Sequence, residues 1–186
     1  MNHFTTHFLE MLMSVFLVDT EAWGKGEAKT INDLFGEVLG GESYLRIDGT
    51  TLTRVVEVAK IKISQALYRN RGYLIEVSRS LPDGRISQRN GYPAEKLKRH
   101  ETPAQAVVRG IHEELQLSEN NIHHMAMMPA VKEIKSSKSY PNLQCIYILH
   151  ESDVVLLNSV SICHKSMFET KEDDGTMHQW KWERFS

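Results

Sequence analysis

Hydrophobic and polar residues change their spacing along this chain of 186 residues, and the change comes near residue 44. The apolar run at residues 4–18 favours an amphipathic helix whose apolar side is covered by the domain or by another chain. The stretch TINDLFGEVLGG, at residues 30–41, indicates a second, shorter helix that Thr30 can cap and Gly40-Gly41 can end. Together these segments predict an N-terminal helical extension over residues 1–43.

From Tyr44 onward, the pattern becomes typical of strands. TLTRVVEVAKIKI, at residues 51–63, alternates in part with period two and is rich in β-branched residues. GYLIEVSRSLPDGRISQR, at residues 72–89, predicts a hairpin with a turn at Pro82-Asp83-Gly84. Strand-like segments return after Leu117. Strands around one well-marked helix predict an α/β (α+β) domain over residues 44–186, in which helices cover a mixed sheet.

The well-marked helix lies in HETPAQAVVRGIHEELQL, at residues 100–117. Thr102 suits the N-cap, Pro103 suits the first helical position, and Gln105 completes a capping box. An apolar face follows at helical spacing, formed by Ala104, Val107, Val108, Ile111 and Leu115. The helix is therefore predicted from about Thr102 to Leu117.

Three charged residues of this helix are not required by its apolar face. Arg109 and Glu113 are one turn apart, so an ordinary surface ion pair is one interpretation. The other interpretation adds Glu101, which can pair with Arg109 and hold the preceding loop against the helix. Glu113 and Glu114 could then direct their oxygens toward a divalent cation such as Mg²⁺, which prefers hard oxygen ligands.

The same segment resembles the Nudix box, G-x5-E-x7-R-E-U-x-E-E-x-G-U, where U is aliphatic. The matching positions are Glu101, Arg109, Ile111, Glu113, Glu114 and Leu117. The resemblance implies a Nudix-like α/β/α sandwich and a hydrolase that uses Mg²⁺ or Mn²⁺. It implies Glu113 and Glu114 as metal ligands, supported by Arg109 and Glu101, and a late-loop acid for which Glu172 is the best candidate. The implied substrate is a nucleoside diphosphate linked to another group, cleaved at a phosphoanhydride bond.

Three positions depart from the box. Glu95 stands at the opening glycine, Gln116 at the closing glycine, and Gly110 at a glutamate that is a metal ligand in the family. Gly110 lies three and four residues before Glu113 and Glu114, so a carboxylate there would share their helical face. A glycine at this position is explained either by tight packing of another group or by space for a substrate group or a partner. The metal site is therefore expected to be incomplete and the hydrolysis slow or absent.

A basic stretch precedes the helix. Its members, which could hold the phosphates of a nucleotide-like substrate or lie in solvent as ordinary loop charges, are Arg85, Arg89, Lys96, Lys98 and Arg99.

The composition bears on three further questions: nucleic-acid binding, membrane or secretory targeting, and the cellular compartment. A net charge of -2 and a pI near 6.5 do not favour bulk binding to nucleic acid. The apolar run at the N-terminus contains Glu10 and is not preceded by Lys or Arg, which disfavours a secretory signal or a transmembrane segment. Cys145 and Cys163 are expected to be reduced core residues, which favours the cytoplasm, with an organelle left open.

Two functions follow as hypotheses. The first is a Nudix-type pyrophosphohydrolase that depends on a divalent cation. The second, motivated by Gly110 and the two missing glycines, is a catalytically inactive Nudix-like binding or assembly module. In the second case the N-terminal helix would dock a protein partner or a second copy of the chain.

Overall fold

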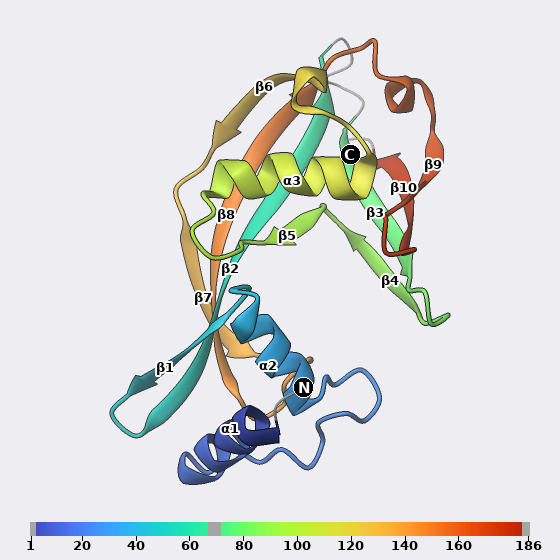
Figure 1. Ribbon diagram of the computed structural model, residues 1–186. Helices are drawn as coiled ribbons and strands as arrows, with labels where there is room; N and C mark the ends of the chain where they lie inside the picture. The colour runs from blue at the N-terminus through green and yellow to red at the C-terminus, as the bar shows by residue number, and fades with distance from the viewer. Residues whose placement is uncertain (1–2, 67–71, 184–186) are drawn as a thin grey trace. The chain divides into compact units, whose positions relative to one another are not determined.

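Helices and strands follow the sequence pattern in the computed structural model, which describes residues 3–66 and 72–183 (Figure 1). The helices are α1 (His3–Val15), α2 (Ile31–Leu39), α3 (Pro103–Leu115) and the short 3-10 helices η2 (Glu119–Asn121) and η3 (Ser161–His164). The strands are β1 (Tyr44–Asp48), β2 (Thr51–Gln65), β3 (Tyr73–Ser80), β4 (Ile86–Gly91), β5 (Ala94–Lys96), β6 (Ile122–Met127), β7 (Val131–Ser136), β8 (Gln144–Leu156), β9 (Met167–Lys171) and β10 (Met177–Glu183). The predicted combination of sheet and helices is confirmed.

The strands form two sheets. One has the order β1-β2-β8-β6, with β5 also paired to β2 and β7 also paired to β8. The other has the order β4-β3-β10-β9. Its three pairings are antiparallel, and the pairing of β3 with β4 confirms the predicted hairpin. No helix of the described residues is long and apolar enough to cross a membrane.

Contacts divide the chain into two units. Unit 1 comprises Met1–Val58, Lys96–Glu101 and Val131–Leu149, and unit 2 comprises Ala59–Glu95, Thr102–Ala130 and His150–Ser186. The long strands β2 and β8 contribute residues to both units. An extension that ends at residue 43 stays a prediction, because the division reflects contacts in space and includes later segments in unit 1.

Unit 1 has an apolar core and a buried group of charges. The core comprises Met13, Leu34, Leu52, Tyr140 and Leu143. Met13 comes from α1, so part of the apolar side of this predicted helix is covered by its own unit. Thr30 caps α2 in a capping box with Asp33, as the sequence indicated for the N-cap. Beside the core, the buried carboxylate of Glu37 pairs with Lys29, Arg54 and Lys96.

Unit 2 contains the hairpin, the β4-β3-β10-β9 sheet and α3. Its fully buried hydrophobic residues include Ile61, Ile63, Leu74, Val107, Ile111, Leu156 and Trp180. Thr102 and Gln105 form the predicted capping box, and Pro103 occupies the first turn. Gln116 ends the helix in the left-handed conformation, with φ of 56°, so α3 is two residues shorter at its C-terminal end than predicted. The two cysteines are free and buried, as expected.

Candidate metal-binding site

A β-bulge in strand β3 lies at the candidate site in unit 2. Trp180 of β10 pairs with Glu76, whereas its neighbour Gln179 pairs with Ser78, so β3 has an extra residue at Val77. Such a bulge bends the strand and changes the direction of its side chains. Glu76 of β3 is 1% exposed, so the strand carries a buried carboxylate.

His178 of β10 lies between two carboxylates. Its Nδ1 is 2.8 Å from Glu76 Oε1, and its Nε2 is 2.5 Å from Glu172 Oε1. Burial favours the neutral ring, but the hydrogen bonds to Glu172 and Glu76 outweigh burial and raise the pKa of His178 to about 9. The imidazolium therefore donates both N–H groups at neutral pH, and it fixes the position of Glu172.

Arg79 links Glu76 to the helix. Its guanidinium donates to Glu76 at 2.8 Å and to Glu114 of α3 at 2.9 Å, and Arg89 also donates to Glu76, at 3.1 Å. Burial alone would raise the pKa of Glu76, but the hydrogen bonds from His178 and Arg79 lower it to about 2. Glu76 is therefore an ionised anchor that holds Arg79 and His178 in place.

Glu114 is the least satisfied group in this network. It is 3% exposed, its Oε1 accepts from Arg79, and its Oε2 is buried without a hydrogen-bond partner among the described residues. Burial raises its pKa to about 7, although the charge of Arg79 opposes this. The Thr170 hydroxyl donates to the Glu114 carbonyl and accepts from Trp180 Nε1 at 2.8 Å, which ties the C-terminal end of α3 to β9 and β10 (Figure 1).

The side chains of Glu114, Glu172 and His178 form one group whose ligand atoms lie within 4.8 Å of one another. Both ring nitrogens of His178 already contact carboxylates, so the groups best placed to receive a cation are Glu114 and Glu172. A buried carboxylate oxygen without a partner is costly, and a divalent cation would satisfy it with the hard-ligand chemistry that carboxylates offer. The residues therefore fit a divalent cation.

Arg109 and Glu113 stand beside this group. Arg109 Nη1 is 2.9 Å from Glu113 Oε2 and 3.0 Å from Glu95 Oε1. Glu113 lines a pocket of about 430 Å³ with His112, Gln116, Lys171, Glu172, Asp173 and Asp174. The two predicted ligands therefore lie in different environments. Glu114 is buried in the group with Glu172 and His178, whereas Glu113 lines the pocket.

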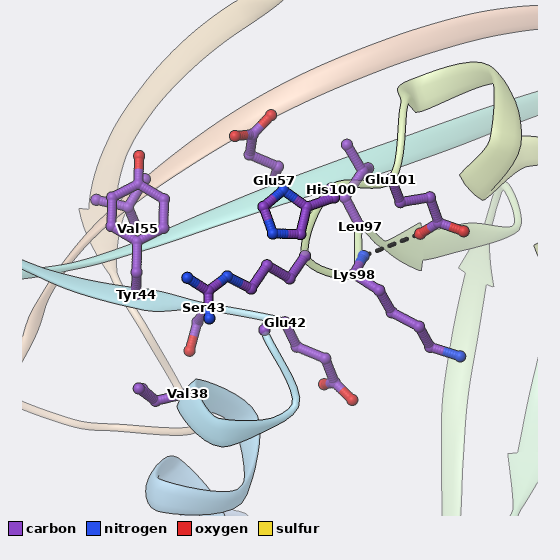
Figure 2. Close-up of a pocket in the computed structure, with 12 residues that line it drawn as sticks. Val38, Glu42, Ser43, Tyr44, Val55, Glu57, Leu97, Lys98, His100 and Glu101 are labelled. Atoms are coloured by element: carbon purple, nitrogen blue, oxygen red, sulfur yellow. Dashed lines mark hydrogen bonds between the residues drawn. The ribbon is translucent and has the colours of Figure 1, made fainter.

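A second pocket, of about 620 Å³, lies in unit 1 and is shown in Figure 2. Glu101 is among its lining residues, and its carboxylate accepts from the Lys98 backbone N–H at 2.9 Å. The lining mixes cations with the carboxylates of Glu42 and Glu57. This pocket is the larger of the two, but the buried carboxylate oxygen that lacks a partner among the described residues, Glu114 Oε2, lies in unit 2.

The predicted phosphate-binding cations are distributed over both units. Arg85 pairs with Asp83 in the hairpin turn, and Arg89 pairs with Glu76. In unit 1, Lys96 pairs with Glu37 and Glu42, while Lys98 and Arg99 line the 620 Å³ pocket. The five residues are not brought together in one unit.

Sequence reasoning missed Glu76, Arg79 and His178. They lie on strands that are about 100 residues apart along the chain, at positions that alternate like any half-buried strand. The one signal in the sequence was the position of Glu76, a charged residue between the apolar residues Ile75 and Val77 of a predicted strand. Glu172, the candidate late-loop acid, does lie in the cluster.

No family model matches the sequence, and no curated protein matches it. Among solved structures, the chain is similar to an Ap4A hydrolase from C. elegans, with 19% identity, coverage of 69% of this chain and 80% of that chain, and a TM-score of 0.38. It is similar to a Nudix hydrolase from Nitrosomonas europaea, with 18% identity, coverage of 68% and 71%, and a TM-score of 0.39. It is also similar to a MutT protein from Bacillus halodurans, with 10% identity, coverage of 68% and 68%, and a TM-score of 0.35. These identities and TM-scores are too low to assign a function to this chain.

Proposed function

We propose that this protein is a Nudix-like hydrolase that needs a divalent cation, Mg²⁺ or Mn²⁺, and cleaves a phosphoanhydride bond. The proposed substrate is a nucleoside diphosphate linked to another group. The observation that carries the proposal is the buried carboxylate of Glu114. One of its oxygens has no hydrogen-bond partner in the part of the chain that the structure describes, and the carboxylate lies in one group with Glu172. Glu114 also occupies one of the two adjacent glutamate positions of the Nudix box that the sequence resembles.

Glu114 and Glu172 are the proposed ligands. A bound cation would neutralise charge that develops on the phosphate oxygens and orient them for attack by water. Arg79 holds Glu114 through Oε1 and leaves Oε2 free, while His178 holds Glu172. Glu76 receives hydrogen bonds from both of these donors, so the supporting groups are fixed by one buried anion. In this arrangement Arg79, His178 and Glu76 act as positioning residues.

The pocket next to Glu172 favours a substrate that arrives with a cation. Four of its seven lining residues are carboxylates, Glu113, Glu172, Asp173 and Asp174, and Lys171 is its lysine. A phosphate would be repelled by this lining in the absence of a cation. Mg²⁺ is commonly held by one or two carboxylates together with substrate phosphates, which matches such a lining. Arg109 neutralises part of the charge by pairing with Glu113.

A catalytically inactive binding or assembly module is the second candidate. The observation that favours it is the use of the predicted phosphate-binding cations within the protein: Lys96 pairs with Glu37 and Glu42, and Arg89 pairs with Glu76. Under this alternative, the cluster would bind a cation and a nucleotide without turnover.

The test is hydrolysis of a panel of nucleoside diphosphate-linked compounds with Mg²⁺ or Mn²⁺, read as released nucleotide. Wild type should be active, and Glu114→Gln and Glu172→Gln should each lose most of the activity while remaining folded. Glu119→Gln, at an exposed position of η2, is the control and should behave as wild type. Metal binding without turnover over the whole panel would support the binding module, and the absence of metal binding would exclude the hydrolase.

A further inference from the structure

Gly110 of α3 is covered by the side chain of Glu95. A Cβ built at position 110 would lie 3.1 Å from Glu95 Cβ, 3.5 Å from Glu95 Cγ and 3.3 Å from Ile61 Cδ1. The space that a side chain at position 110 would occupy is therefore filled. Of the two explanations for Gly110, tight packing and space for a substrate or partner, the structure supports tight packing. The side chain that packs against Gly110 is that of Glu95, which carries a carboxylate.

The Glu95 carboxylate is held by Arg109, outside the group formed by Glu114, Glu172 and His178. Its Oε1 is 3.0 Å from Arg109 Nη1, the same nitrogen that contacts Glu113. Burial raises the pKa of Glu95, Arg109 opposes the rise, and the charges of Glu113 and Glu172 add to it. Glu95 in turn raises the pKa of Glu114. The negative charges of strand β5, helix α3 and the loop after β9 thus act on one another.

Glu114 supplies an independent reason to expect a ligand here. Its buried Oε2 has no partner among the described residues, and Gly110 precedes it by one helical turn on the buried face of α3. The Glu95 side chain approaches the helix at this turn. A carboxylate from outside the helix therefore enters beside the position from which a side chain at 110 would have pointed.

We propose that Glu95 supplies the negative charge that position 110 lacks and, from beside the group of Glu114, Glu172 and His178, strengthens the binding of the cation that Glu114 and Glu172 hold. The proposal rests on the proposed function. It joins two departures from the Nudix box into one exchange, since a glutamate replaces the glycine at position 95 and a glycine replaces the glutamate at position 110. The negative charge around the site is then conserved, although one carboxylate comes from β5 instead of α3.

The direct test is a titration of the full chain with Mn²⁺. The electron paramagnetic resonance signal of free Mn²⁺ measures how much of the ion is bound. Glu95→Gln keeps the size of the side chain and should weaken Mn²⁺ binding by at least about tenfold. Glu151→Gln is the matched control, because Glu151 is also partly buried in unit 2 and pairs with Lys60 and Lys62. The control should bind Mn²⁺ as wild type does.

The exchange itself gives a second test. Gly110→Glu alone should lower the melting temperature, because the new Cβ would lie 3.1 Å from Glu95 Cβ. Glu95→Gly alone should bind Mn²⁺ weakly. The double variant Glu95→Gly with Gly110→Glu should recover much of the stability and of the Mn²⁺ affinity.

Two results separate the role of Glu95 from the proposed function. If Glu95→Gln binds Mn²⁺ as wild type while Glu114→Gln does not, the role of Glu95 is overturned and the proposed function stands. If wild type does not bind Mn²⁺, the proposed function falls and the role of Glu95 falls with it.

Discussion

Adjacent glutamates on one helix receive different environments in this protein. Glu114 is 3% exposed and faces buried charges, whereas the side chain of Glu113 is 38% exposed and pairs with Arg109. The two positions differ by about 100° around the helix axis, which is enough to place one inside and the other at the rim. Residue type and spacing identify both as candidate ligands, but burial distinguishes them.

Glu114→Gln tests this difference at the residue scale. The amide keeps the shape of the side chain and its bond to Arg79, but it removes the negative charge that a cation needs. We expect Mn²⁺ affinity to fall by at least about tenfold, while the melting temperature without metal does not fall, because a buried carboxylate with an unpartnered oxygen costs stability. Isothermal titration calorimetry and thermal unfolding measure the two effects.

Glu113→Gln is the neighbour control for this prediction. It should reduce Mn²⁺ affinity less than Glu114→Gln does, because Glu113 is partly exposed and already neutralised by Arg109. Equal losses in the two variants would contradict the assignment of Glu114 as the principal ligand of α3.

The buried charges of unit 1 predict a pH dependence of stability. Burial alone would raise the pKa of Glu37, but the hydrogen bonds from Lys29 and Lys96 and the charge of Arg54 lower it from 4.5 to about 2. A carboxyl with a lower pKa in the folded state contributes stability that is complete above the unfolded pKa and is lost as the pH falls through the folded pKa. The contribution is at most about 3 kcal/mol.

Glu37→Gln should therefore be less stable than wild type by up to about 3 kcal/mol at pH 7, because the amide no longer offers an anion to Lys29, Lys96 and the buried Arg54. The difference should shrink between about pH 4.5 and about pH 2, where the wild-type carboxyl becomes neutral. Urea unfolding over this pH range measures it. Glu133→Gln, at a partly exposed glutamate paired with Lys135, should change stability little, and a difference for Glu37→Gln that is constant with pH would refute the linkage.

At the scale of elements, local signals were sufficient for the helices and the hairpin. The Thr102 and Thr30 caps act within three residues, and the turn at Pro82-Asp83-Gly84 is encoded by its own residue types. The site needed more, because Glu76 and His178 meet only when β3 pairs with β10 around a bulge. Pairing between strands 100 residues apart has no signal in one sequence, so the supporting network could not be predicted.

Helix α1 offers a prediction at the same scale. Met13 is 2% exposed in the core of unit 1, whereas Met11, two positions earlier on the same helix, is 53% exposed. Met13→Ala should lower the free energy of unfolding by about 2–4 kcal/mol, since it removes buried methylenes and leaves a cavity. Met11→Ala should change it by less than about 0.5 kcal/mol. Chemical denaturation of both variants compares them, and equal effects would show that the helix does not pack as described.

At the scale of the whole molecule, the pattern of hydrophobic and polar residues predicted the class of fold. It did not predict the division into two units. Unit 1 combines the N-terminal segment with residues 96–101 and 131–149, which a reading along the chain cannot bring together. A partner or second copy at α1 stays a prediction. Phe8, Met11 and Val15 form an exposed apolar row there, at 55%, 53% and 68% exposure, and a monomeric mass in solution would remove a second copy from consideration.

The central claim is that unit 2 holds a divalent cation between helix α3 and the loop that follows β9. A crystal of the full chain soaked in Mn²⁺, and measured for anomalous scattering, tests it most directly. We expect a peak in contact with the carboxylates of Glu114 and Glu172, next to His178. An intact fold without a peak at these carboxylates, or with Mn²⁺ bound only elsewhere, would contradict it.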